Sequence, residues 1–305
     1  MSMDIGKTRN FVMRNARPLD AARWRFLFEG GSADEVLDAL SAYQNEDGGF
    51  GHGLEPDSLN PYSSPMQTWA ATEIIKETEL SDSEHPIIKG ILKYLSSGAD
   101  FDGRLWANTV KSNDDYPHAP WWSYSRESGN YNPTASLAGF CLRFGDPSSP
   151  MFSTAETIAL DAYEWFRANC PIESMHTAYN FLELSEYLYE SECSIIDHHE
   201  FEDLIEKQLS SLLTADSEKW ESEYVAKPSL YITSSDSPYY SDQKKACDAE
   251  CDFLERTQLA DGTWAITWAW DSYPEEWSIS KNFWKSDQAI RNVKFLKGMG
   301  YLNKK

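Results

Sequence analysis

The chain has 305 residues, enough to bury a substantial hydrophobic core without disulfide bonds. Its 49 acidic and 27 basic residues leave a formal charge of −22, which disfavours nucleic acids and anionic lipid surfaces as partners. No segment reads as a signal peptide or a membrane span, and the five cysteines are too sparse for a disulfide framework. We therefore expect a reduced, cytoplasmic protein with no nucleic-acid partner and no membrane span.

Apolar residues recur at helical spacing through most of the chain. The predicted helices cover residues 9–28 with a break near Pro18, then 33–43, 66–79, 85–95, 133–144, 154–168, 175–189, 201–213, 244–257 and 282–301. Residues 221–242 read as irregular, strands are nearly absent, and no Pro/Gly/Ser-rich linker divides the chain. The sequence thus predicts an all-α fold, with residues 1–305 forming a single domain.

Two stretches, residues 39–50 and 253–264, share one pattern. Each has a leucine, a glutamine four positions later, an Asp-Gly pair, and a large aromatic two positions after the glycine. Each closes a predicted helix, and the glutamine can bond the open carbonyls of the last turn or the first amides of the next helix. The glycine tolerates positive φ, and the aromatic residue, Phe50 or Trp264, is expected to pack back as a plug.

This pattern resembles the QW repeat of terpenoid cyclases, and the Asp-Gly-Gly-Phe ending resembles the version in protein prenyltransferase β-subunits. Residues 253–264 match it fully, whereas residues 39–50 differ at Ala39 and Phe50. Weaker echoes occur at 94–106 and 209–220, which together indicate a repeated architecture. The resemblance implies an α/α toroid, a closed ring of about five to six helical hairpins around a cavity.

The catalytic signatures of that superfamily are incomplete in this sequence. The nearest match to Asp-x-Asp-Asp, residues 100–103, lacks the final aspartate, and residues 114–118 depart from Asp-Asp-x-x-Asp at the last position. No aspartate, cysteine and later histidine are spaced as in the zinc site of the prenyltransferases. No catalytic residue is therefore carried over from the resemblance, no metal site is assigned, and the cofactor stays unknown.

The most distinctive polar tract holds His52, Glu55 and Asp57 between glycines and prolines. A rigid loop of this kind at a cavity rim can present Glu55 or Asp57 as a general acid, and the three side chains together could hold a metal. In the alternative reading, Asp57 caps the following turn and Glu55 bonds loop amides. Glu55 and Asp57 are the catalytic candidates.

Aromatic and polar residues gather in the predicted loops and at the starts of helices, where they would wall a cavity. The substrate-binding candidates are His52, Trp69, Trp121, Trp122, Tyr124, His176, Asp236, Trp268 and Trp270. For Asp236, which lies in a serine-rich stretch, a role as a turn residue is the alternative.

Three functions fit these features. The first is an enzyme that acts on an apolar, isoprenoid-like small-molecule substrate by acid catalysis in an aromatic cavity, because ring faces stabilise positive charge. The second is a carbohydrate-active hydrolase or lyase of the same fold, since sugars also stack on aromatic rings. The third is a non-catalytic protein that binds a small molecule on this scaffold. The oligomeric state is left open.

Overall fold

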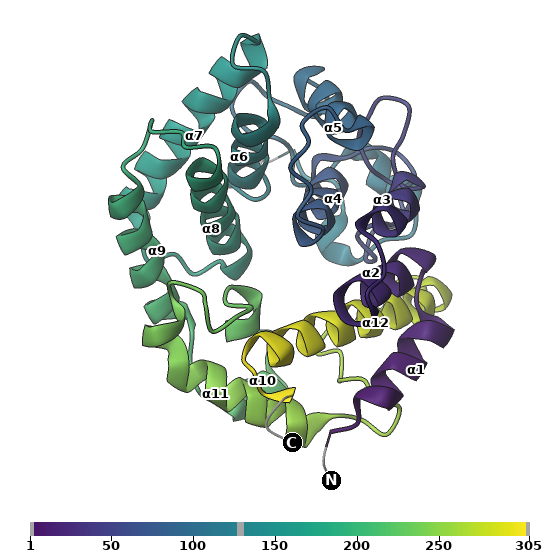
Figure 1. The fold of residues 1–305 in the computed structure, drawn as a ribbon. Helices are drawn as coiled ribbons and strands as arrows, with labels where there is room; N and C mark the ends of the chain where they lie inside the picture. The colour runs from purple at the N-terminus through teal and green to yellow at the C-terminus, as the bar shows by residue number, and fades with distance from the viewer. Residues whose placement is uncertain (1–2, 127–130, 303–305) are drawn as a thin grey trace. The chain divides into compact units, whose positions relative to one another are not determined.

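The computed structural model describes residues 3–126 and 131–302 (Figure 1). These residues form twelve α-helices and three 3-10 helices, with isolated β-bridges and no strand among them. The α-helices are α1 (Ile5–Asn15), α2 (Pro18–Glu29), α3 (Ala33–Ser41), α4 (Pro65–Glu77), α5 (Pro86–Ser96), α6 (Thr134–Phe144), α7 (Pro150–Asn169), α8 (Met175–Glu190), α9 (His198–Leu212), α10 (Ser217–Ser222), α11 (Tyr240–Thr257) and α12 (Pro274–Gly298). The 3-10 helices are η1 (Lys111–Asp115), η2 (Pro120–Trp122) and η3 (Pro228–Leu230).

The all-α prediction is confirmed for the described residues, and each predicted helix is present. The break near Pro18 separates α1 from α2, with the proline at the first position of α2, where its missing N–H costs nothing. Two elements differ from the prediction. The short helix α10 was not predicted, and α12 begins at Pro274, well before the expected residue 282. None of the helices in the described ranges is long and apolar enough to cross a lipid bilayer.

The chain folds into two compact units. Unit 2 is residues 40–208, and unit 1 combines residues 1–39 with residues 209–305. The core of unit 2 is α6, in which nearly every side chain is buried. α6 packs against α7 and α8 and also touches α4 and α5. Its sequence is apolar except at Thr134, Ser136 and Arg143, as expected of a helix that is surrounded on most sides.

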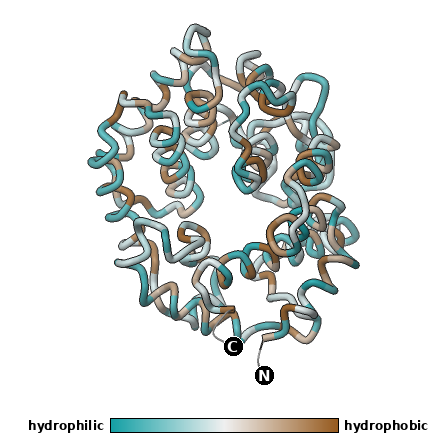
Figure 2. Tube along the Cα trace, in the orientation of Figure 1, coloured by the Kyte–Doolittle hydropathy of each residue, from teal (hydrophilic) through white to brown (hydrophobic). Residues whose placement is uncertain are grey.

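In unit 1, α12 packs against α1 and α2, and η3 lies against both α11 and α12. The helices mix hydrophobic and hydrophilic positions along their length, as Figure 2 shows. A buried ionic cluster ties α2 to α12: Arg23 donates to Asp287 Oδ1 at 2.7 Å and to Asp20 Oδ1 at 3.2 Å. Arg17 also pairs with Asp20, at 2.7 Å, and Arg291 with Asp287, at 2.7 Å. The three guanidinium groups keep both carboxylates paired, as buried charges require.

The turn after α3 is stabilised by Gln44. Its Nε2 donates to the carbonyl of Gly48 at 2.9 Å and to the carbonyl of Ile87, in the first turn of α5, at 3.1 Å. Asp47 Oδ1 accepts from the Gly49 amide at 2.9 Å, and Phe50 is completely buried. The glutamine therefore closes the turn and attaches it to the start of another helix.

The turn after α11 has the same construction. Gln258 Nε2 donates to the Gly262 carbonyl at 3.1 Å and to Thr8 Oγ1, in α1, at 2.9 Å. Its Oε1 accepts from the amide of Asp4, the residue that caps α1, at 2.7 Å. Trp264 is buried, and its indole N–H donates to the Leu254 carbonyl of α11 at 2.8 Å, so in this turn the aromatic residue packs back against the helix.

Candidate functional site

The loop with His52, Glu55 and Asp57 is ordered by its own hydrogen bonds. His52 is exposed, adopts φ of 59°, and bonds Asn45 Oδ1 through Nε2 at 2.9 Å. Glu55 Oε2 accepts from the Asp57 amide at 3.0 Å, and the Glu55 amide donates to Gln67 Oε1 at 2.8 Å. Asp57 is buried, and its carbonyl accepts from the Ala119 amide at 2.8 Å. Glu55 thus bonds a loop amide, as the alternative reading expected.

Glu55 also lines a small cavity together with Trp122 of η2 and Asn108. The other aromatic candidates from this region lie apart from that cavity. Trp121 is 47% exposed and Tyr124 is 40% exposed, so both rings face solvent. The Tyr124 amide donates to Asp114 Oδ1 at 2.9 Å, which explains how this loop holds its shape. Of the pair of tryptophans, only Trp122 contributes to an enclosed space.

Asp236, Trp268 and Trp270 belong to unit 1. Asp236 is exposed, and its amide donates to Ser234 Oγ at 3.1 Å, which is the turn geometry of the alternative reading. Trp268 packs edge-to-face against Tyr224 and Trp284, with ring centroids 5.3 and 5.2 Å apart. Trp270 is buried beside Trp277, at 5.6 Å. Trp268 and Trp270 therefore each lie against other aromatic rings of unit 1.

A group of polar side chains links α4 to α8 within unit 2. Trp69, on α4, donates its indole N–H to Glu183 Oε2 on α8 at 2.8 Å, and its ring meets that of Tyr179 edge-to-face at 6.3 Å. Tyr179 donates to Glu73 Oε2 at 2.5 Å. The spacings 69–73 and 179–183 are single helical turns, so each helix presents both of its residues on one face. His176 precedes Tyr179 by three residues on α8, and its carbonyl accepts from Asn180.

Glu73 and Glu183 each carry one buried oxygen that lacks a donor. In each, Oε2 accepts an aromatic donor, while Oε1 is buried without a donor among the described residues. Burial, and after it the charge of Glu73, raises the pKa of Glu183 well above its ordinary value. The environment of Glu183 therefore favours its neutral form, whose O–H can donate a hydrogen bond.

Lys76 and Glu186 lie one turn further along the same two helices and form an ion pair. Lys76 Nζ also lies 5.3 Å from the centre of the Tyr187 ring. Both side chains of the ion pair are partly exposed, at 28% and 40%, whereas Glu183 has no exposed surface. Trp69, Glu73 and Tyr179 are also partly exposed. The acid pair thus has a buried member and a member that solvent or a ligand can approach.

Sequence reasoning selected Trp69 but missed Glu73 and Glu183, because both lie inside helices rather than in loops. A signal for Glu183 was available. It follows Phe181 and Leu182, precedes Leu184, and has tyrosines four positions before and after it on the same helical face. A carboxyl group in such an apolar setting must lose its charge or find partners.

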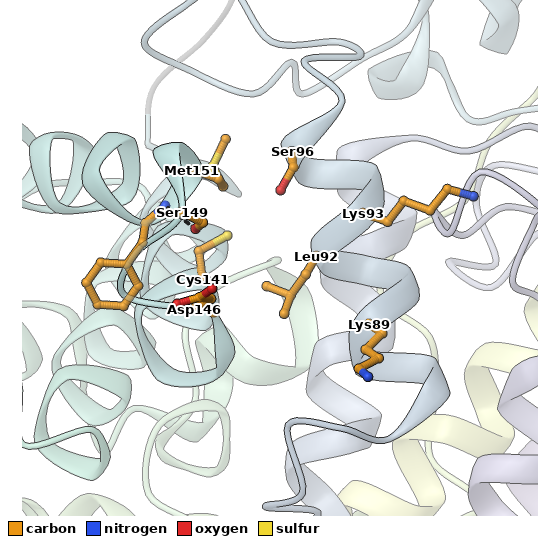
Figure 3. Close-up of a pocket in the computed structure, with 10 residues that line it drawn as sticks. Lys89, Leu92, Lys93, Ser96, Cys141, Asp146, Ser149 and Met151 are labelled. Atoms are coloured by element: carbon orange, nitrogen blue, oxygen red, sulfur yellow. Dashed lines mark hydrogen bonds between the residues drawn. The ribbon is translucent and has the colours of Figure 1, made fainter.

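A pocket with a volume of about 270 Å³ lies between α5 and the α6–α7 connection (Figure 3). Leu92 and Met151 give it an apolar wall, and burial raises the pKa of the Cys141 thiol to about 12. Lys93 points away from it and donates to the Glu46 carbonyl at 2.8 Å. None of the predicted site residues lines this pocket, and its thiol is neutral at physiological pH.

Comparisons of this chain with protein-family models, with curated proteins and with solved structures found no match.

Proposed function

We propose that the protein is a general-acid enzyme that acts on an apolar, isoprenoid-like substrate, with the Glu73–Glu183 pair as its proton source. The observation that carries this proposal is a pair of carboxyl groups, on α4 and α8, whose Oε2 atoms accept from Tyr179 and Trp69 while their buried Oε1 atoms have no donor among the described residues. Burial of Glu183 raises its pKa and favours its neutral form. A carboxylic acid that stays neutral at pH 7 can donate a proton to a substrate as weakly basic as a carbon–carbon double bond.

The surrounding rings suit the species that protonation would create. Glu183 would pass its proton to Glu73, and Glu73 would pass one proton to the substrate, which leaves the pair one proton poorer and the substrate cationic. The faces of Trp69 and Tyr179 lie beside the pair and can stabilise positive charge at carbon. Loss of a proton from the product cation would return the pair to its starting state.

Assays on a panel of acyclic isoprenoid hydrocarbons, alcohols and epoxides, with products detected by mass spectrometry, test this proposal. We expect the wild type to isomerise or cyclise at least one of them and Glu183→Gln to lose this activity. Glutamine is a matched replacement, because its oxygen can accept from Trp69 and its amide group can donate to Glu73. The fold should therefore survive. The infrared difference spectrum of the wild type minus Glu183→Gln at pH 7 should also show a protonated-carboxyl band, because the contribution of Glu250, whose pKa is about 7, cancels in it.

Two further variants locate the acid. Glu186→Gln removes a nearby, partly exposed carboxylate and should keep most of the activity. Glu55→Gln tests the residue that the sequence favoured as the acid. If Glu55→Gln loses activity while Glu183→Gln keeps full activity, the acid lies in the His52–Asp57 loop and not at Glu183. If the wild type converts no panel member while its melting temperature rises with one of them, the protein is a binder rather than an enzyme.

The scaffold for this chemistry, in our proposal, is the α/α toroid that the repeated turns imply. The support comes from the turns at 44–50 and 258–264, which have the same hydrogen bonds. In each turn the glutamine side chain donates to the carbonyl of the turn's glycine and also donates to a residue of another helix. Small-angle scattering tests it. A compact chain of this length should have a radius of gyration of about 19 Å, and an open stack of hairpins a clearly larger one.

A further inference from the structure

The small cavity beside Glu55 contains two polar atoms that the protein itself does not satisfy. Trp122 Nε1 and Asn108 Oδ1 are both buried, and neither has a hydrogen-bond partner among the described residues. Both residues line the same cavity, which has a volume of about 10 Å³. One atom is a donor and the other an acceptor, and an unpaired buried group of either kind is costly.

The neighbouring polar groups are already engaged with each other. Gln67 Nε2 donates to the Ser58 carbonyl at 2.8 Å, and Asn113 Nδ2 donates to the Trp122 carbonyl at 2.9 Å. The side chains of Gln67 and Asn113 thus fix the walls of the cavity, and the indole N–H and the amide oxygen are left to bind a molecule inside it.

We infer that this cavity binds one buried water molecule, which accepts a hydrogen bond from Trp122 Nε1–H and donates one to Asn108 Oδ1. The volume matches that of a single water, since about 10 to 15 Å³ of this kind of space is the minimum for one. The lining suits a neutral molecule that both accepts and donates: an anion would face the amide oxygen and the Glu55 carboxyl group, and a cation would face the indole N–H. Larger polar ligands do not fit.

The water connects two loops that the sequence singled out for function. Glu55, Ser58 and Gln67 line the cavity from the segment before and at the start of α4, and Asn108 and Trp122 line it from the segment after α5. A water held between them fixes Trp122 in its partly buried position beside Glu55. This inference is independent of the proposed acid chemistry at Glu73 and Glu183.

Nuclear magnetic resonance of the full chain with labelled tryptophan tests the site directly. We expect the Trp122 indole proton to show a cross-relaxation peak with a long-lived water, and the indole proton of Trp121, which is 47% exposed, to show none. A crystal structure at high resolution should place a water within hydrogen-bond distance of both atoms. A cavity without density, or an indole N–H bonded to another protein group, would overturn the inference.

Paired substitutions provide a second test. Trp122→Phe removes the donor, Asn108→Leu removes the acceptor, and each should lower the melting temperature because the water loses one of its two anchors. The double variant should melt only slightly below the lower of the single variants, since the water is already lost in each. If the decrease in melting temperature of the double variant equals the sum of the two single decreases, the two residues do not share a water. Trp121→Phe is the matched control and should leave the melting temperature unchanged.

Discussion

Glu250 shows how a single buried carboxyl group sets the pH response of a segment. It has no exposed surface and lies on α11, where it accepts from the Ser229 amide at 2.7 Å and from Ser229 Oγ at 2.5 Å. These bonds hold η3 against α11. Burial raises the pKa of Glu250 from 4.5 to about 7, although the two bonds from Ser229 and the charge of Lys227 act in the opposite direction. Desolvation of the charged form therefore outweighs the hydrogen bonds.

We expect the free energy of unfolding to fall as the pH rises through this range. The folded state binds the proton more tightly than the unfolded state, so the contribution of Glu250 is complete below pH 4.5 and is lost as the pH passes about 7. The loss is about 3 kcal/mol. Urea unfolding between pH 4.5 and 8 should show a shallower decline for Glu250→Gln than for the wild type. Parallel curves for the two proteins would contradict this assignment.

At the same scale, the sequence could identify residue types but not all of their partners. Trp69 was expected to wall a cavity, and the structure places its indole N–H on Glu183. The bonds of Trp69 to Glu183 and of Tyr179 to Glu73 depend on two helices that come together across a long stretch of sequence. Spacing within either helix cannot reveal that contact, because it is set by how α4 and α8 pack in unit 2.

Among the helices, α2 and α12 are joined by a cluster of buried ion pairs. Asp287 is buried and contacts Arg23 and Arg291, and these cations hold the pKa of Asp287 well below its ordinary value despite its burial. We expect Asp287→Ala to destabilise unit 1 by about 3 to 5 kcal/mol, because the buried guanidinium group of Arg23 then loses one of its two carboxylate partners. Chemical denaturation measures this loss.

An exposed ion pair in the same unit is the control. Lys244 and Asp248, on α11, are 58% and 55% exposed. Asp248→Ala should cost at most about 1 kcal/mol, since solvent screens such pairs. Equal losses for the two variants would show that the buried cluster does not hold α2 on α12.

The turn between α3 and α4 depends on a close approach to α5. Gly48 has φ of 95°, and a Cβ added there would lie 2.0 Å from the Gly90 carbonyl oxygen. Gly98 also has positive φ, 75°, but an added Cβ would meet nothing within 4 Å. We therefore expect Gly98→Ala to cost about 1 to 2 kcal/mol from backbone strain alone. Gly48→Ala should cost clearly more in the same thermal unfolding experiment, and similar costs would rule out the steric explanation.

Helix positions were largely predictable from the sequence, because apolar spacing and proline starts are local signals. The helix that was missed, α10, has only one buried side chain, Trp220, so no periodicity can appear. The early start of α12 has a related cause. Pro274, Glu275 and Glu276 favour a helix start, but residues 274–281 bury only Ser280, so the apolar pattern begins later.

For the whole molecule, the dominant physical property is its charge of −22. Repulsion between like charges opposes the compact state, and salt screens it, since the Debye length falls from about 30 Å at 0.01 M to about 8 Å at 0.15 M salt. We expect the melting temperature to rise with sodium chloride over this range. A melting temperature that falls would mean that attractive ion pairs outweigh the net charge.

Unit 1 is built from the two ends of the chain, and this affects the order in which the protein can fold during translation. Its first 39 residues and its last 97 belong to one compact body, and the whole of unit 2 is encoded between them. On the ribosome, α1 and α2 emerge early, yet α12, against which both pack, is among the last segments to be translated. Unit 2 can therefore fold before α12 is made, and the faces of α1 and α2 that pack on α12 stay uncovered until the end of synthesis.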